Sequence, residues 1–263
     1  MNMVVCIKQV PDTAAQVRVK PDGSGIVTEG LNWVLNPYDE YAVEEALRIK
    51  ERLGEGKVTV ITVGPDQTSA ALRSCVAMGA DEAVQIWDAG LERADTSVTA
   101  RLLATGLKRL EWDLVLCGKV AVDDNASSVG PAVAELLGAP HVSAIVSLAV
   151  DKGAQTIRAE RETEDGAEVV ECRLPAVVTA EKGLNEPRYA SLPNIMKAKR
   201  KEITKWTLND LGLQADDPSL QPRTQVLQTL PPPERPAGRV VQGELGDLVE
   251  AITGFLRDEA KAI

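Results

Sequence analysis

The sequence has few aromatic residues and no excess of positive charge. Aromatic side chains make up 3% of the 263 residues, whereas hydrophobic residues of all kinds make up 44%. The core must therefore be built from Val, Leu, Ala and Ile, which is typical of a sheet covered by helices. The formal net charge of -10 argues against non-specific binding to nucleic acid, which requires a basic surface.

Long hydrophobic runs are also missing. No apolar stretch reaches the roughly 20 residues that cross a bilayer, so we do not expect insertion into a membrane. The chain begins with MNMVVCIKQV, which is typical of a first strand rather than of a signal or transit peptide. We therefore expect a cytoplasmic protein.

The few cysteines and the single histidine show no metal-binding or catalytic spacing. Cys6, Cys75, Cys117 and Cys172 are far apart, each has apolar neighbours, and none forms a CxxC pair. We interpret them as small buried hydrophobic residues. His141 follows a Gly-Ala-Pro turn. The pattern therefore favours neither a zinc or iron–sulfur site nor a catalytic triad.

Strands and helices alternate through the first half of the chain. This alternation predicts an α/β fold, with a parallel sheet, right-handed crossovers and helices on both faces. Asn36 is expected to cap the first helix, with Pro37 in its first turn and Gly54 at its end. The expected strands are 4–10, 57–63, 83–87 and 114–117, the expected helices are 36–54, 68–77, 95–110 and 129–137, and PDGSG is expected to turn a hairpin between 17–20 and 26–28.

The pattern changes after His141. Segments 142–150, 155–162 and 167–173 alternate between turns, which predicts an antiparallel meander appended to the sheet, and 175–180 is expected to be a last short buried strand. Past residue 208 the chain is rich in proline and charge, with apolar residues at helical spacing near its end. We predict an α/β domain over 1–183, a recognition loop with a short helix over 184–206, and an extended C-terminal arm over 207–263.

The stretch 113–138 predicts a buried strand, a polar loop and a helix. Ser127 or Ser128 is expected to cap the helix, whose first-turn N–H groups form an anion site. Asp123 and Asp124 repel phosphate and suit ribose hydroxyls, an adenine amine or backbone caps. The loop therefore favours a nucleotide over a bare anion, although a capped turn that binds nothing is the alternative for one such loop taken alone.

Two motifs in the chain resemble those of one known family. GKVAVDDNASSVGP, from Gly118 to Pro131, is similar to the adenine-nucleotide loop of electron transfer flavoprotein beta subunits, although Val120 stands where a glutamine is usual. LNEPRYASLPNIMKAKRKEI, from Leu184 to Ile203, resembles the signature of the same family very closely. NPYDEYAVEEA and MGAD, which both precede these two motifs in the chain, also match, so the resemblance runs from Val4 to about Trp206.

The resemblance implies a Rossmann-like fold of the adenine nucleotide alpha hydrolase-like kind, in one subunit of a heterodimer. FAD lies mostly in the alpha subunit, and Tyr38 matches an aromatic residue at the wall of its ring. AMP is implied in this chain as a structural ligand. The matching cofactor-binding residues are Cys6, Asn36, Pro37, Tyr38, Asp39, Val63, Gly118, Lys119, Val120, Ala121, Val122, Asp123, Asp124, Asn125, Ala126, Ser127, Ser128 and Val129.

The resemblance also implies partners. Leu192 matches the anchor leucine of a loop that docks acyl-CoA dehydrogenases in fatty acid beta-oxidation. Glu162 matches an acidic residue that meets the mobile flavin domain. The C-terminal arm matches a clasp around the alpha subunit. The implied role is an electron carrier without catalysis of its own, which passes electrons to a membrane quinone oxidoreductase. The matching partner-binding residues are Glu162, Leu192, Pro193, Ile195, Met196, Lys197 and Arg200.

Two alternatives stay open at this point. SSVGP and IKQVPD resemble the electron-bifurcating branch of the family, in which a second FAD replaces AMP and NADH is oxidised, whereas Asp124 stands where that branch usually has glycine. Outside the family, an ATP-dependent enzyme or nucleotide sensor needs a glycine-rich phosphate motif. The sequence contains neither SGGxDS nor GxxGxGxxS.

Overall fold

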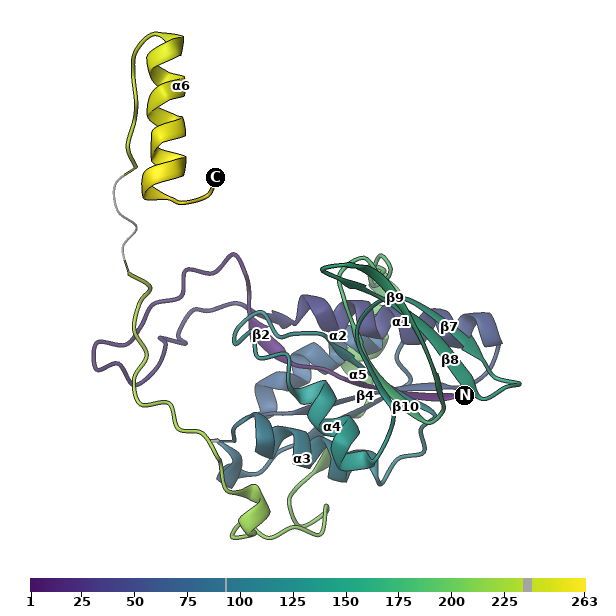
Figure 1. The fold of residues 1–263 in the computed structure, drawn as a ribbon. Helices are drawn as coiled ribbons and strands as arrows, with labels where there is room; N and C mark the ends of the chain where they lie inside the picture. The colour runs from purple at the N-terminus through teal and green to yellow at the C-terminus, as the bar shows by residue number, and fades with distance from the viewer. Residues whose placement is uncertain (93, 234–237) are drawn as a thin grey trace. The chain divides into compact units, whose positions relative to one another are not determined.

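The computed structural model describes residues 1–92, 94–233 and 238–263. Figure 1 shows the fold as a ribbon. A nine-stranded sheet has the order β11-β5-β4-β1-β6-β10-β7-β8-β9. Strands β1, β4, β5, β6, β10 and β11 run parallel to their neighbours, and β7 pairs in parallel with β10. The predicted α/β fold is therefore confirmed. The parallel part comprises β1 (Asn2–Cys6), β4 (Lys57–Val63), β5 (Glu82–Ile86), β6 (Leu114–Gly118), β10 (Ala176–Ala180) and β11 (Thr204–Trp206).

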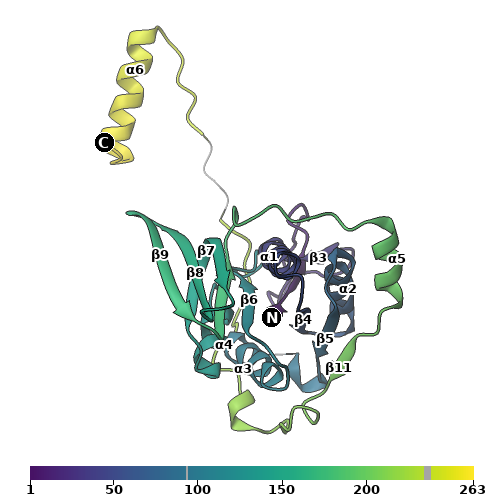
Figure 2. The ribbon, with the colours of Figure 1, turned by 90° about the vertical axis from the view of Figure 1, so that its right-hand side faces the viewer.

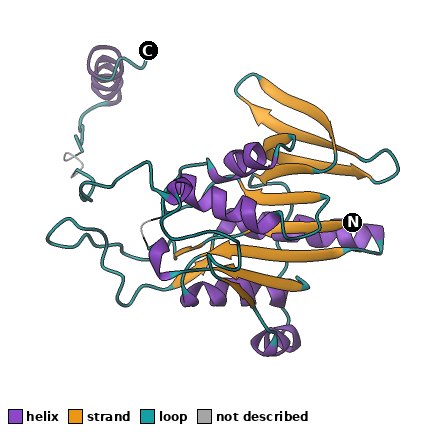
Figure 3. Cartoon of the chain, turned by 90° about the horizontal axis from the view of Figure 1, so that it is seen from below, coloured by secondary structure: helices purple, strands orange, loops and turns teal. Residues whose placement is uncertain are grey.

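Helices cover both faces of the sheet (Figures 2 and 3). Helices α1 (Pro37–Leu53) and α2 (Ser69–Met78) pack on the face that receives Met3 and Val5 of β1. Helices α3 (Thr96–Leu107) and α4 (Val129–Leu137) pack on the face that receives Val4 and Cys6. Successive residues of a strand point to opposite faces, so one buried strand supplies both cores. The cores are almost wholly aliphatic, as the composition predicts.

The antiparallel meander is confirmed as β7 (His141–Asp151), β8 (Thr156–Thr163) and β9 (Gly166–Arg173). Strand β10 then returns between β6 and β7. The prediction that β10 is the last strand was wrong, since β11 follows it and pairs with β5. Three residues are too few for a hydrophobic pattern, so β11 leaves little signal in the sequence.

The expected strand 4–10 was also wrong as one element. β1 ends at Cys6, and β2 (Gln9–Pro11) pairs instead with β3 (Trp33–Leu35) in a separate antiparallel sheet. The chain therefore leaves the main sheet at Ile7 and Lys8.

The expected helix 95–110 ends at Leu107, and its cap, Asp95, accepts a hydrogen bond from the Val98 N–H.

The chain divides into two compact units, residues 1–17 with 27–227 and residues 18–26 with 228–263. The second unit holds the expected hairpin as a single antiparallel bridge between Val19 and Ile26. It also contains α6 (Leu245–Gly254), which continues as a π-helical turn over Phe255–Glu259. No residue of α6 is buried, and Leu245, Val249 and Ile252 are among its exposed apolar residues. The predicted division into three parts stays a prediction.

Within the described residues, no helix combines the length and the apolar character that a membrane crossing requires. The remaining described elements are α5 (Leu192–Arg200) and the short helical turns Asp66–Thr68, Ala89–Leu91 and Pro218–Leu220.

Candidate functional site

The loop between β6 and α4 starts at the carboxyl ends of the parallel strands. Cys6, the last residue of β1, lies opposite Cys117 of β6 on one side and Ile61 of β4 on the other. Val63 ends β4 at the same edge. Ligands of open α/β sheets collect outside these strand ends. The structure therefore brings together three segments that the sequence places far apart.

Asp39 connects this loop to helix α1 and to the end of β1. Its Oδ1 accepts hydrogen bonds from the Gly118 N–H at 3.1 Å and from Asn36 Nδ2 at 3.0 Å, and its Oδ2 accepts from the Lys8 N–H at 2.6 Å. Burial raises the pKa of Asp39 to about 7, although these donors act in the opposite direction. A predicted ligand-binding residue is therefore also the acceptor that organises the strand ends.

Gly118 lets the loop start directly against α1. A Cβ atom at this position would lie 2.3 Å from Asp39 Oδ1 and 2.9 Å from the backbone carbonyl carbon of Tyr38. These separations are shorter than real Cβ contacts, and the second one involves backbone, which moves less easily than a side chain. Only glycine fits between the loop and the half-buried Tyr38.

The predicted cap positions of both site helices are confirmed, but neither side chain makes the expected cap hydrogen bond. Asn36 occupies the cap position of α1 but makes no cap hydrogen bond. Its Nδ2 donates to the Val120 carbonyl at 2.9 Å and its Oδ1 accepts from the Val122 N–H at 3.2 Å. The Asn36 side chain therefore provides hydrogen-bond partners for two backbone groups of the loop. Ser128 likewise occupies the cap position of α4 without a cap hydrogen bond.

Lys8 is the site residue that the sequence reasoning missed. Its Nζ lies 2.8 Å from Asp123 Oδ1 and 2.9 Å from Asp124 Oδ2. Burial acts to lower the pKa of Lys8, but the hydrogen bonds to Asp123 and Asp124 outweigh it and the net pKa is raised. Its separation of 115 residues from Asp123 leaves no local pattern that could reveal the pairing.

The tip of the loop is exposed over residues 122–127 and has a defined shape. The Asn125 N–H donates to the Ala121 carbonyl at 2.9 Å, and the Ala126 N–H donates to Asp124 Oδ1 at 3.0 Å. Asn125 and Ser127 have φ angles of 52° and 51°, a left-handed conformation that is uncommon outside glycine.

Lys119 does not reach into this loop. Its Nζ lies 2.5 Å from Glu181 Oε2, and its N–H donates to the Ala180 carbonyl at 2.8 Å. Lys119 therefore fastens the start of the loop to the end of β10.

Glu162, another predicted site residue, is exposed on β8 opposite Ala167 of β9. It therefore lies on the antiparallel extension of the sheet rather than at the carboxyl ends of the parallel strands.

The second motif presents an exposed apolar surface. Leu192 is 76% exposed at the start of α5, and Tyr189 just before it is fully exposed. Ser191 caps this helix by accepting a hydrogen bond from the Asn194 N–H. Large exposed apolar side chains next to one another are typical of partner contacts. The other predicted partner-binding residues of the helix are also exposed: Pro193, Ile195, Met196, Lys197 and Arg200.

Helix α1 holds the chain that leads to this surface. The Arg188 guanidinium lies 2.8 Å from Glu44 Oε2 and 2.5 Å from Glu51 Oε1, and these ion pairs raise its pKa. Asn185 Nδ2 donates to the Tyr41 carbonyl at 3.0 Å. The segment is therefore attached before residue 189, where it becomes exposed.

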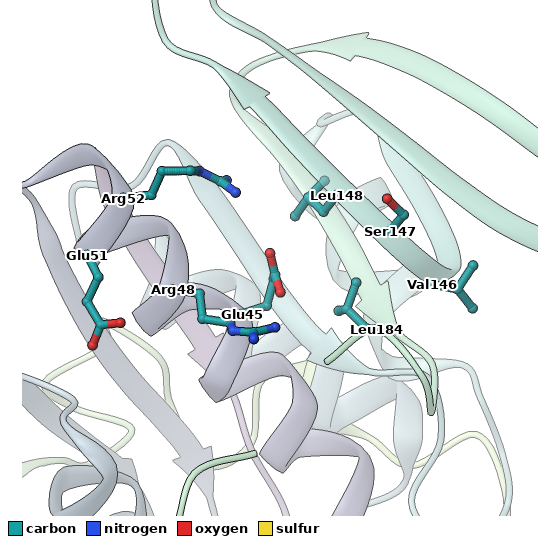
Figure 4. Close-up of a pocket in the computed structure, with 8 residues that line it drawn as sticks. All are labelled: Glu45, Arg48, Glu51, Arg52, Val146, Ser147, Leu148 and Leu184. Carbon is teal, nitrogen blue, oxygen red and sulfur yellow. The ribbon is translucent and has the colours of Figure 1, made fainter. Parts of the chain in front are cut away.

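An open pocket of about 410 Å³ lies beside α1 (Figure 4). The guanidinium groups of Arg48 and Arg52 and the Glu45 carboxylate line one side, and Leu148 and Leu184 line the other. None of the predicted site residues lines it. We therefore place the candidate site at the strand ends and not in this pocket.

Comparison with known proteins gives consistent matches along the chain. The family model "Electron transfer flavoprotein domain" matches residues 24–211. The chain is 39% identical over 264 residues to the electron transfer flavoprotein subunit beta of Bacillus subtilis, with all of both chains covered. It is 41% identical over 246 residues to the human protein of that name, with 92% of this chain and 93% of the relative covered.

A third relative is named as part of a larger assembly. The chain is 39% identical over 263 residues to the caffeyl-CoA reductase-Etf complex subunit CarD of Acetobacterium woodii, with 99% of this chain and 98% of the relative covered. Together with the fold and the two motifs, these matches show that the chain belongs to the electron transfer flavoprotein family, among its beta subunits.

Proposed function

We propose that this chain pairs with an alpha subunit and relays electrons from acyl-CoA dehydrogenases, through FAD, to a membrane quinone oxidoreductase. Its similarity over the full length of electron transfer flavoprotein beta subunits supports this role. The observation that carries the proposal is the loop at the strand ends, held by Asn36, Asp39 and Lys8.

We infer that the loop binds AMP. The first-turn N–H groups of α4 receive no side-chain cap from Ser128, and such groups attract a phosphate. Lys8 offsets the negative charge of Asp123 and Asp124, which would otherwise repel that phosphate. The residues of the tip from Val122 to Ser127 are exposed, so a base and a ribose can reach them. The residues present therefore fit an adenine mononucleotide.

Tyr38 is proposed as the contact with the shared FAD. It is half-buried in the first turn of α1 and lies directly against Gly118 at the start of the loop. When bound, FAD supplies the redox chemistry of the heterodimer. The role of this chain is to shape one wall of the flavin site and to keep it rigid. A nucleotide in the neighbouring loop would stabilise that wall by binding only the folded state.

The alternative is the bifurcating class, in which the same loop binds a second FAD. Its open tip and the resemblance of SSVGP and IKQVPD to that branch favour it over functions outside the family. Co-expression with the alpha subunit and extraction of bound nucleotides separates the two. One FAD with AMP supports the relay, whereas two FAD with NADH oxidation supports bifurcation. A heterodimer that holds no nucleotide in this chain would contradict both.

Docking through α5 predicts the effect of a single substitution. Leu192→Ala is expected to slow reduction by an acyl-CoA dehydrogenase roughly tenfold or more, because truncating an anchor empties the pocket that receives it. Bound FAD should be unchanged, because Leu192 lies on α5 and not at the strand ends. Stopped-flow reduction measures the rate, with Val226→Ala, an exposed apolar residue outside the motif, as the control. Equal rates for the parent and Leu192→Ala would remove Leu192 as the anchor.

A further inference from the structure

The geometry points to Arg73 as a positioning residue that fixes the docking helix α5 and leaves its cationic side chains free for a partner. Arg73 lies on α2, and α2 and α5 pack side by side (Figure 2). This inference rests on the proposed docking role of α5. It concerns a residue outside the motif itself, more than a hundred positions earlier in the chain.

Arg73 binds the carboxyl end of α5 through three backbone carbonyls. Its Nη1 lies 2.6 Å from the Ala198 oxygen, 3.0 Å from the Lys199 oxygen and 3.1 Å from the Lys201 oxygen. The last carbonyls of a helix have no partner within the helix, and together they carry partial negative charge. All three contacts are made by one nitrogen, Nη1, so its two N–H groups are shared among the three oxygens.

The contact between the two helices is close because Ala198 is small. Ala198 is 2% exposed and is the one buried residue of α5. A larger residue there would push α5 away from α2. Burial of one small side chain contributes little free energy, so packing alone holds this nine-residue helix weakly. The hydrogen bonds from Arg73 therefore add a directional link between α5 and α2.

Arg73 lies next to other cationic side chains, which is an unfavourable position for a positive charge unless the carbonyls of α5 bind it. Lys197, Lys199, Arg200 and Lys201 already place four cations at this end of α5, and a fifth cation is repelled by them. Basic side chains in the last turn of a helix commonly bind its terminal carbonyls themselves. Here Arg73 binds these carbonyls from outside. Lys197, Lys199 and Arg200 remain exposed, where they can surround an apolar anchor as a charged rim.

Helix α2 is itself anchored near the candidate nucleotide site. Gln85 is 1% exposed, and its Nε2 donates to the Gly64 and Pro65 carbonyls at 3.0 and 2.8 Å, in the turn that precedes α2. Gln9 Nε2 donates to the Gln67 carbonyl at 3.2 Å. Arg73 thus attaches α5 to a helix whose start is fixed, so the Leu192 side chain is presented at a defined place.

The test uses the heterodimer with three variants, Arg73→Ala, Arg73→Lys and the control Arg52→Ala, an exposed arginine on α1. The first readout is steady-state turnover of an acyl-CoA dehydrogenase with the heterodimer as the varied acceptor. Arg73→Ala is expected to raise KM about five- to tenfold with little change in kcat, because docking and not electron transfer is weakened. Arg73→Lys should recover part of the loss, and Arg52→Ala should match the parent.

The second readout does not depend on docking. Limited digestion with trypsin, followed by mass spectrometry, measures cleavage after Lys197, Lys199, Arg200 and Lys201. Arg73→Ala is expected to accelerate this cleavage on the order of tenfold, because an unfastened helix opens more often. Unchanged KM and unchanged cleavage in Arg73→Ala would overturn the inference. If Leu192→Ala also leaves KM unchanged while Arg73→Ala accelerates cleavage, the proposed docking role fails and the structural role of Arg73 stands.

Discussion

Gly118 is a residue at which the loop between β6 and α4 lies close against helix α1. The neighbouring atoms belong to Asp39 and to the backbone of Tyr38, two residues that are proposed to border the nucleotide and the flavin. A single added methyl group therefore acts on both proposed sites at once. The shape of both proposed sites therefore depends on the close approach of the loop to α1.

Gly118→Ala is expected to lower the affinity for AMP at least tenfold and to destabilise the chain by about 1–3 kcal/mol, because the added Cβ forces the loop off α1. Isothermal titration of a nucleotide-stripped heterodimer with AMP measures the affinity. Gly90→Ala is the matched control, because a Cβ at Gly90 meets no atom within 4 Å. Equal affinities in the two variants would show that the loop tolerates the methyl group.

Asp39 predicts a dependence of stability on pH. Its pKa is about 7 in the folded chain against an ordinary value of 3.8, so between these values the folded state binds a proton that the unfolded state does not. The stability that Asp39 contributes is therefore greatest below about pH 4, falls as the pH rises from about 4 to about 7, and is constant above pH 7. The shift corresponds to at most about 4 kcal/mol.

Thermal unfolding of the parent and of Asp39→Asn between pH 5 and 8 isolates this contribution, because the other titrating groups are common to both. Because the parent loses stability as Asp39 ionises and the variant does not, the melting temperature of the parent relative to the variant is expected to be highest at pH 5 and to fall toward pH 8. A difference in melting temperature that is the same across this range would place the pKa of Asp39 outside it.

At the scale of the elements, Lys8 connects the end of β1 to the loop before α4. Its two ion pairs lie at the surface, with 41% of the Lys8 side chain exposed, so each contributes little to stability. Their effect is on the loop: without the ammonium, two neighbouring carboxylates repel each other and repel a phosphate.

Lys8→Gln is therefore expected to weaken AMP binding about five- to tenfold while the melting temperature changes little. Lys8→Arg should retain most of the affinity because it keeps the charge. Titration calorimetry checks both, with Lys205→Gln as the control, since Lys205 forms a similar exposed pair with Asp66. Binding that is equally strong in Lys8→Gln would mean that Asp123 and Asp124 lie away from the phosphate.

At the scale of the whole molecule, the second compact unit carries a helix, α6, with exposed apolar side chains. Leu245, Val249, Ile252 and Phe255 are 45–77% exposed along α6 and the turn that follows. Within this unit, Arg239 pairs with Glu259 and lies over the Phe255 ring at 5.9 Å. A short helix gains stability mainly from packing its apolar face, so we propose that the alpha subunit covers it.

The double variant Val249→Asp with Ile252→Asp is expected to reduce recovery of the heterodimer at least tenfold, because two charges would be buried without partners. Co-purification through a tag on the alpha subunit measures recovery, and Glu250→Ala on the same helix is the control. Full recovery of the double variant would show that α6 is not part of the interface.

Local patterns in the amino-acid sequence were enough to identify the classes of element and the two motifs. Strand and helix patterns and the Gly54 stop depend on contacts between near neighbours, which periodicity and local chemistry reveal. The loop at Gly118 was found for the same reason. Its residues were also identified by resemblance, which needs no knowledge of contacts.

The tertiary structure decided which groups meet. Strand order places the end of β1 beside β6, so Lys8 reaches Asp123 and Asp39 reaches the Gly118 N–H. The same packing turned Asn36 from a helix cap into a partner of the loop and brought Arg73 to the end of α5. Hydrogen bonds between distant segments depend on the sheet order and the helix packing, and neither leaves a local pattern in the chain.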